Sequence, residues 1–328
     1  MKYTIYDIAK LANTSVSTIS RYLNHKPVTE ENRIKIEKVL SNIDFKPNAM
    51  ARALVSNSLK TVAIITVDIR VPHFASITYF FEQEFTKRGY HVIICNTSGS
   101  VEKAIDYLKM LLNTKIDGIA FVGSIFDLLN SNKEAMELLK NIPVVVANGQ
   151  LNLPNCYSVL CDDAYGVSQA VEYLFKKGRH NIFYINDIDT KSALFKIDGF
   201  VSTTKRLGIY DSSHVIKTNH SIDSGMQIIK NIIKNKEVFD AFICSDDEVA
   251  VGVINQLKYE GYLVGKEIDV VGYNNTTLSE VTIPKMTVIN NKAEEEAKLL
   301  VLLLEKLING DKTQSITIKP ELIIKGSA

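Results

Sequence analysis

The sequence predicts a small all-α head followed by an α/β body of two doubly wound lobes, each with a parallel sheet. In residues 4–43, apolar residues recur at helical spacing in three short stretches. From residue 61 onward, short apolar runs alternate with amphipathic stretches of roughly ten residues or more, the pattern of strands and covering helices in parallel sheets. The body is longer than one doubly wound unit, so we expect two lobes with a cleft between them.

Three helices are expected in the head, and each has a recognisable start. Thr4 is the N-cap of the first, which stops at a break at residues 13–14, and Ser15 caps the second. Pro27 interrupts the chain, and Thr29 opens the third helix. A turn of about three to four residues between the first two helices is typical of a helix-turn-helix unit.

The stretch TIYDIAKLANTSVSTISRYLN places short hydroxyl side chains on the second helix. Ile19 faces inward, whereas Ser17, Thr18 and Arg21 face outward. Short hydroxyl groups allow close approach to phosphates and bases, Ser15 leaves helix N-terminal N–H groups pointing at phosphate, and Arg21 can reach guanine. We therefore expect the second helix to lie in the major groove of double-stranded DNA.

Two alternatives stay open for the head. Val16 could pack inward or contact a thymine methyl group, and the three helices could form a packing domain whose serines only cap helices. Residues 1–60 hold ten Lys and Arg against five Asp and Glu, a net charge of +5, whereas the remaining chain is at −4. A basic head on a mildly acidic body is typical of a polyanion-binding module, although a solvated run of charges has the same composition.

Composition and cysteine usage indicate an ordinary globular protein. The chain is 46% hydrophobic and 23% charged. Cys95, Cys156, Cys161 and Cys244 show no C-x-x-C spacing, and three of them end apolar runs, so we expect buried, reduced thiols. The sequence shows no signal-peptide pattern and no apolar run near about 18 residues. We therefore expect a cytoplasmic protein that does not span a membrane.

The sequence argues against an enzyme. It contains none of the motifs G-x-S-x-G, H-E-x-x-H, G-x-x-x-x-G-K-[ST] and G-x-G-x-x-G, and its histidines are scattered. The carboxylate pairs at 162–163 and 246–247 are adjacent, but neighbours along a chain point in different directions. Asp246 is better explained as the cap of the helix after the AFIC strand, facing the cleft. We expect no catalytic residue, no metal site and no cofactor.

A series of motifs follows the head stretch quoted above. In order, they are KPVTEENRIKI, FKPNAMARALVSNSLKTVAII, GYHVIICNT, IDGIAFVGS, IPVVVANG, CSDDEVAVG and VVGYNNTTLSEVTIPKMTVI. Together they resemble the lactose-repressor (LacI/GalR) family of bacterial transcription regulators. A helix-turn-helix alone would be weakly specific, but this ordered series covers essentially the whole chain.

The resemblance implies a helix-turn-helix domain at 1–46, a hinge helix and linker at 47–59, and an effector-binding and dimerisation domain at 60–328. The segment PNAMARALV is too short for a stable isolated helix, so it needs a partner. In the family it folds when two copies pair in the DNA minor groove and a leucine wedges between base steps. The alternative is a linker helix docked on the body. The predicted DNA-binding residues are Thr4, Ser15, Val16, Ser17, Thr18, Arg21, Asn24, Ala51, Arg52 and Leu54.

The resemblance also implies a body like a periplasmic sugar-binding protein, with the effector in the cleft. The chain would cross between lobes near Val159, Asn290 and Lys319, giving an N-lobe at about 60–159 and 290–318 and a C-lobe at about 160–289 and 319–328. The predicted effector-binding residues are His73, Phe74, Asn148, Ser192, Lys196, His220, Asp246, Asp247 and Asn274.

Two of these residues depart from the family pattern. At the position of Lys196 the family usually has arginine. Lysine cannot reproduce the bidentate contact that the planar guanidinium group of arginine makes. At the position of Asn274 the family usually has aspartate. Asparagine lacks the carboxylate, a group that only accepts hydrogen bonds and can pair with a cation. We therefore expect a less charged pocket than the family norm, which opens the alternatives of a rare or phosphorylated effector or a degenerate pocket.

The expected function is a homodimeric regulator, most simply a repressor of a sugar-utilisation operon. Two heads would bind half-sites of an operator, and a small-molecule effector would change lobe closure and DNA affinity. Because the chain ends at IKPELIIKGSA, we expect a dimer and no tetramer. One alternative is a regulator driven by a protein corepressor of the phosphocarrier type. The other is a solute-binding protein, against which the basic head and the missing signal peptide argue.

The hinge hypothesis predicts a selective effect of Leu54→Ala. Removing the wedge should weaken operator binding and leave effector binding intact, because the effector cleft is in the body. A DNA-binding titration beside an effector titration measures both. Operator affinity equal to that of the unaltered protein would disprove the hinge hypothesis.

Overall fold

The computed structural model describes residues 3–23, 26–43 and 59–328. Contacts divide the chain into a head, Met1–Thr61 with Thr114–Asp117, and a body, Val62–Asn113 with Gly118–Ala328. No helix among the described residues is long and apolar enough to cross a membrane.

The head contains the three predicted helices, α1 (Ile5–Leu11), α2 (Val16–Leu23) and α3 (Glu30–Leu40). Thr4 caps α1 in a reciprocal capping box with Asp7. The oxygen of Ser15 accepts the backbone N–H of Thr18 at 3.1 Å, so Ser15 caps α2 as predicted. Thr29 precedes α3, but its side chain makes no capping hydrogen bond. A small apolar core that includes Ile8, Ile19 and Ile36 joins the three helices.

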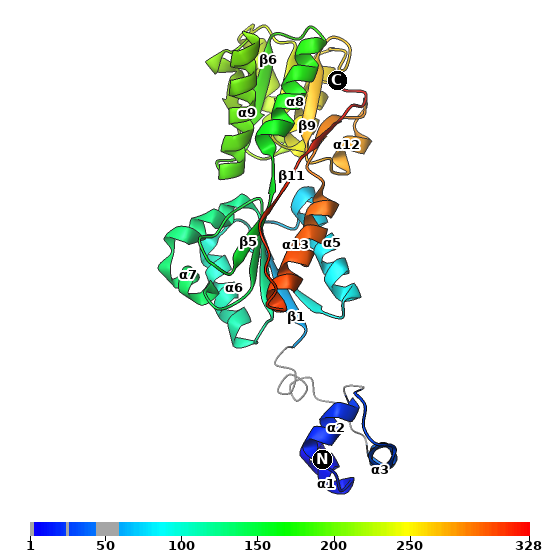
Figure 1. Ribbon diagram of the computed structural model, residues 1–328. Coiled ribbons are helices and arrows are strands. Elements are labelled where there is room, and N and C mark those ends of the chain that lie inside the picture. The colour runs from blue at the N-terminus through cyan, green and yellow to red at the C-terminus, as the bar shows by residue number, and fades with distance from the viewer. Residues whose placement is uncertain (1–2, 24–25, 44–58) are drawn as a thin grey trace. The chain divides into compact units, whose positions relative to one another are not determined.

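The first lobe of the body, called the N-lobe, is a six-stranded sheet in the order β11-β5-β4-β3-β1-β2. Its strands are β1 (Thr61–Thr66), β2 (His91–Asn96), β3 (Gly118–Val122), β4 (Val144–Ala147), β5 (Cys156–Cys161) and β11 (Ile316–Ile318). Helices α5 (Pro72–Lys87) and α13 (Ala293–Ile308) cover one face, and α6 (Val101–Asn113) and α7 (Lys133–Leu139) cover the other (Figure 1). The 3-10 helix η1 (Ser124–Ser131) follows β3.

The second lobe, called the C-lobe, is a six-stranded sheet in the order β12-β10-β9-β8-β6-β7. Its strands are β6 (Ile182–Asn186), β7 (Val215–Lys217), β8 (Ala241–Cys244), β9 (Asp269–Tyr273), β10 (Thr287–Asn290) and β12 (Glu321–Ile323). Its helices are α8 (Asp163–Lys176), α9 (Lys191–Leu207), α10 (Ile222–Lys234), α11 (Asp247–Tyr259) and α12 (Leu278–Val281), with the 3-10 helix η2 (Ser212–His214) before β7. The prediction of a parallel sheet is confirmed in this lobe, with an exception at one edge, where β12 pairs antiparallel with β10. The chain returns there from the N-lobe, and an edge strand can be added in either direction.

The alternation of side chains along the strands separates two cores in the C-lobe. Phe183 and Ile185 of β6 join the core beneath α10 and α11, whereas Ile182 and Tyr184 join the core beneath α8 and α9. Helices α10 and α11 approach each other closely, since a Cβ at Gly225 would lie 2.2 Å from the carbonyl oxygen of Val249. Burial of both sheet faces explains why the strand segments are apolar runs rather than alternating patterns.

Three connections join the lobes. The first follows β5, the second follows β10, and the third runs between β11 and β12. Val159 pairs with Ala147 of β4 and Ile316 of β11, so the first connection begins beyond Val159, after Cys161. Figure 1 shows β5, β11 and α13 converging where the lobes meet.

All four cysteines are free thiols. Cys95 and Cys244 are buried, as predicted, but Cys161 and Cys156 are only partly buried. The prediction for Cys161 is therefore wrong, because this residue ends β5 at the edge of a hollow rather than within the core.

A carboxyl group lies inside the N-lobe without a partner. Glu296 of α13 is 1% exposed, and neither of its oxygens has a hydrogen-bond partner among the described residues. Burial, reinforced by the nearby Asp163 carboxylate, raises the pKa of Glu296 well above its ordinary value of 4.5. The folded chain therefore retains a proton that the unfolded chain releases, so stability falls as pH rises above about 4.5.

Replacing Glu296 by glutamine should flatten this pH dependence. Between the unfolded and folded pKa values, one retained proton contributes a slope of about 1.4 kcal/mol per pH unit to the free energy of unfolding. Denaturant unfolding of Glu296→Gln at several pH values above about 5 should show a slope smaller by that amount. The exposed neighbour change Glu295→Gln is the control, and equal slopes for both variants would contradict the burial argument.

Candidate functional site

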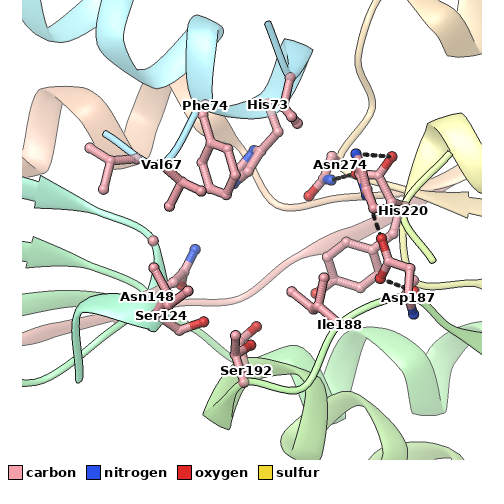
Figure 2. Close-up of a pocket in the computed structure, with 18 of the residues that line it drawn as sticks. Val67, His73, Phe74, Ser124, Asn148, Asp187, Ile188, Ser192, His220 and Asn274 are labelled. Atoms are coloured by element: carbon pink, nitrogen blue, oxygen red, sulfur yellow. Dashed lines mark hydrogen bonds and ion pairs between the residues drawn. The ribbon is translucent and has the colours of Figure 1, made fainter. Parts of the chain in front are cut away.

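A cavity of about 440 Å³ lies between the two lobes of the body (Figure 2). It is lined by residues that follow the ends of strands in both sheets. Gly123 follows β3 and Asn148 follows β4 in the N-lobe, while Asp187 follows β6 and Asn274 follows β9 in the C-lobe. Ligands of open α/β sheets bind at such carboxyl ends, so we take this cavity as the candidate effector site.

The N-lobe wall of the cavity is mainly apolar. Phe74 of α5 presents a partly buried ring to the cavity, beside Val67, Val71 and Ile125. His73 next to it is buried, and burial together with the charge of Lys196 lowers the pKa of its imidazole to about 3. This histidine is therefore neutral near pH 7 and acts as a hydrogen-bonding group rather than a charge.

The C-lobe wall carries two carboxylates that are already held in place. Asp163 accepts hydrogen bonds from the hydroxyls of Tyr273 and Ser192, each at 2.5 Å. Asp187 accepts the hydroxyl of Ser245 at 2.5 Å and contacts the imidazole of His220. Each bond leaves further lone pairs on the carboxylate oxygens for a ligand.

His220 supplies a positive charge to this wall. Its Nδ1 lies 2.5 Å from Asp187, and this hydrogen bond, with the charges of Asp246 and Glu248, raises the pKa of His220 to about 9. Protonation makes both ring nitrogens donors. Nε2 is buried without a hydrogen-bond partner among the described residues, although it lies 3.7 Å from Glu248.

A chain of polar contacts connects the two lobes along one side of the cavity. His73 of the N-lobe lies 3.4 Å from Nδ2 of Asn291, in the second connection. Asn291 donates to Asn274 at 2.7 Å, and Asn274 donates to Asp246 at 2.7 Å. Asp246 is the N-cap of α11, as predicted, and burial raises its pKa to about 6. An ionised aspartate at position 274 could not make this contact with an ionised Asp246, because a carboxylate has no N–H to donate.

Lys196 is fixed at the base of the C-lobe wall. Its side chain is 8% exposed, and its ammonium donates to the carbonyl of Ser245 at 3.1 Å. The same nitrogen lies 3.7 Å from the centre of the Tyr273 ring, a cation–π contact. These two contacts use the ammonium as a point charge rather than as a bidentate fork.

The structure brings together eight of the nine predicted effector residues, whose binding role stays a prediction. The exception is Asp247, which is fully buried and accepts the backbone N–H and the hydroxyl of Thr276 at 2.7 and 2.8 Å. Asp246 caps α11 and faces the cavity, whereas Asp247 does not line it. The cavity residues that sequence analysis missed include Asp163, Asp187, Ser245, Tyr273 and Asn291.

In the head, the polar side chains of α2 lie on the surface. Ser15 and Ser17 are exposed, and their hydroxyl oxygens lie 2.7 Å apart, while Ser15 and Thr18 oxygens lie 2.8 Å apart. Arg21 is exposed and donates from Nε to the carbonyl of Pro27 at 3.2 Å.

Two further predicted DNA-binding residues have structural roles in the head. Val16 is partly buried against the core, which favours inward packing over a thymine contact. The Thr4 hydroxyl serves the α1 cap. Four predicted DNA-binding residues lie outside the described part of the chain: Asn24, Ala51, Arg52 and Leu54.

Two known protein families match this sequence, one over the body and one over the head. Residues 58–325 match the family of periplasmic binding proteins and sugar binding domains of the LacI family, and residues 4–48 match the bacterial regulatory proteins of the lacI family. The chain belongs to the LacI family. It is therefore a DNA-binding transcription regulator with a helix-turn-helix head, and the solute-binding alternative is excluded. LacI-family proteins are regulators and not enzymes.

Individual relatives agree with this assignment. An HTH-type transcriptional regulator of Lachnoclostridium phytofermentans is 31% identical over 98% of both chains. Catabolite control protein A of Priestia megaterium is 27% identical over 96% of this chain and 95% of its own. In fold, the crystal structure of the lac repressor dimer bound to operator and the anti-inducer ONPF matches with a TM-score of 0.86 and 22% identity, covering 100% of this chain and 99% of the repressor.

The contact between Asn274 and Asp246 predicts that Asn274→Asp is destabilising. The change places a second carboxylate beside the buried Asp246 and removes the donor, so we expect a loss of roughly 1–3 kcal/mol near pH 8. The loss should shrink near about pH 5, where Asp246 is mostly protonated and can itself donate.

Denaturant unfolding at both pH values measures this effect. The matched control is the double variant Asp246→Asn with Asn274→Asp, which exchanges the two groups and should recover most of the lost stability. A single variant as stable as the unaltered protein near pH 8 would show that the contact contributes nothing.

Proposed function

We propose that this LacI-family regulator is a homodimeric repressor whose effector is an uncharged sugar bound between the lobes. The two heads bind the half-sites of an operator in front of sugar-utilisation genes. The observation that carries the proposal is the asymmetry of the cavity, in which an apolar wall with the Phe74 ring faces a wall of fixed carboxylates and hydroxyls. A sugar has apolar ring faces and a periphery of hydroxyls, so it matches both walls.

The charges around the cavity support an uncharged ligand over an anionic one. Asp163, Asp187 and Asp246 line the C-lobe wall, and the cations there are Lys196 and His220. Lys196 is engaged by a carbonyl and an aromatic ring, and His220 is paired with Asp187 through Nδ1, which leaves its Nε2 as one donor for a ligand hydroxyl. A phosphate or carboxylate would meet more negative than available positive charge. The cavity therefore favours neutral sugars over the phosphorylated alternative.

Control of DNA binding follows from lobe closure in this proposal. The polar chain from His73 through Asn291 to Asn274 and Asp246 crosses from one lobe to the other. A ligand that contacts both walls binds one degree of lobe closure more tightly than another. Only such a difference in affinity can shift the equilibrium between the two conformations of the lobes. Linkage then requires operator DNA to change effector affinity by the same factor.

The first test is a thermal-shift screen of the full chain against neutral sugars, sugar phosphates and nucleobases. A ligand at about 100 times its Kd adds roughly 2.7 kcal/mol to stability, which is a clear shift. We expect a neutral sugar to stabilise the protein and its phosphate ester to do so less. Stabilisation by the phosphorylated form alone would contradict the proposal, and no hit in a broad panel would favour the protein corepressor, which stays an untested alternative.

Phe74→Ala should weaken sugar binding at least tenfold, because the ring supplies the apolar face of the site. Calorimetric titration with the sugar found in the screen measures the affinity. The control is Tyr259→Ala, which removes a ring that is 82% exposed on α11 and does not line the cavity. Equal losses in both variants would argue against a specific role for Phe74.

A further inference from the structure

A second hollow of about 250 Å³ opens beside the effector cavity. It shares Asn148, Asp163 and Ser192 with the cavity, and Figure 2 shows Asn148 and Ser192 on the side away from His73. We propose that this hollow is a second sugar subsite and that the effector contains at least two sugar rings. This inference rests on the proposed sugar-binding function and specifies the size of the ligand.

The lining of the hollow has the chemistry of a sugar subsite. Phe195 of α9 lies one helical turn after Ser192, and its side chain is 49% exposed, so the ring can receive a ligand without being uncovered first. Polar side chains line the same hollow, among them Asp127, Gln150, Asp162, Lys191 and Thr317. One aromatic face with several donors and acceptors is the composition expected for binding a second polyhydroxylated ring.

Both lobes contribute to the hollow, and a hydrogen bond within the N-lobe holds its side of the hollow in place. Asp127 of η1 accepts the backbone N–H of Gln150 at 2.5 Å, which ties η1 to the loop after β4. From the C-lobe, the charge of Lys191 acts on Asp127 and opposes the rise in the pKa of that carboxyl that burial causes. A ring bound here would therefore contact both lobes, as the first ring does in the cavity.

The wall shared by the two spaces consists of fixed polar groups. Ser192 donates to Asp163 at 2.5 Å, and Asn148 accepts the backbone N–H of Cys161 at 2.7 Å. A ligand that passes from one space into the other crosses polar side chains whose orientation is set before binding. These shared polar groups can hydrogen-bond to a glycosidic linkage, which has an ether oxygen and neighbouring hydroxyls.

A third hollow adjoins the cavity through Ser124 and Ile188, and its lining is different. Six of its twelve lining residues are apolar, among them Leu128, Leu194 and Ile197, and it shares Asp127 and Lys191 with the second hollow but not the Phe195 ring. The described residues that line it offer no aromatic ring on which a second sugar could stack. Leu194, which is 64% exposed beside Phe195, lines this third hollow and not the second, so it provides a matched control.

The experiment is calorimetric titration of the full chain with disaccharides and their component monosaccharides, including cellobiose, maltose, lactose and sucrose with glucose, galactose and fructose. We expect one disaccharide to bind at least tenfold tighter than its monosaccharides. Phe195→Ala should remove at least tenfold of that affinity and leave monosaccharide binding within about twofold. Leu194→Ala should change neither, and Phe195→Tyr should retain disaccharide binding.

The outcomes separate this inference from the function on which it rests. A disaccharide that binds equally well to Phe195→Ala, or a monosaccharide that binds as tightly as every disaccharide, overturns the second subsite while leaving the sugar effector intact. A loss in Leu194→Ala instead of Phe195→Ala overturns it in favour of the third hollow. Absence of binding by every sugar overturns the proposed function and the subsite together.

Discussion

The candidate effector cavity depends on one constraint of parallel sheets, which is that strands running together also end together. In each lobe the strands carry their following residues to the same edge, and the three connections turn those edges toward one another. Asn148, Asp187, Ser245 and Asn274 are each the first residue after a buried strand. The buried strands therefore fix the side chains of the site, even though the residues come from distant parts of the sequence.

The polar chain that runs from His73 of the N-lobe to Asp246 of the C-lobe is made of contacts whose energies suit regulation. The hydrogen bonds from Asn291 to Asn274 and from Asn274 to Asp246 are buried, and a typical bond of this kind contributes roughly 0.5–1.5 kcal/mol. Two conformations separated by a few kcal/mol can be redistributed by a ligand with a modest preference. Asn274 accepts from Asn291 and donates to Asp246, so its amide relays the polar chain between them.

Much of the fold could be predicted from the sequence, because the apolar runs of buried parallel strands and the capped helices of the head are local patterns. The antiparallel β12 was missed, since three residues at a sheet edge carry no local signal. Within the site, family motifs led to Lys196 and Asp246, but Asp187 was missed because its role arises only from contacts with Ser245 and His220. The sequence could not show that Asp247 points away from the cavity while Asp246 faces it, because adjacency does not reveal the direction of a side chain.

The most direct test of the account is the coupling between cavity and head. Fluorescence anisotropy with a duplex selected by the purified protein from random sequence would give operator affinity with and without a bound sugar. The account predicts a change of about 5- to 150-fold, with the same factor recovered when sugar affinity is measured with and without the duplex. A sugar that binds in the cavity and leaves operator affinity unchanged would contradict it.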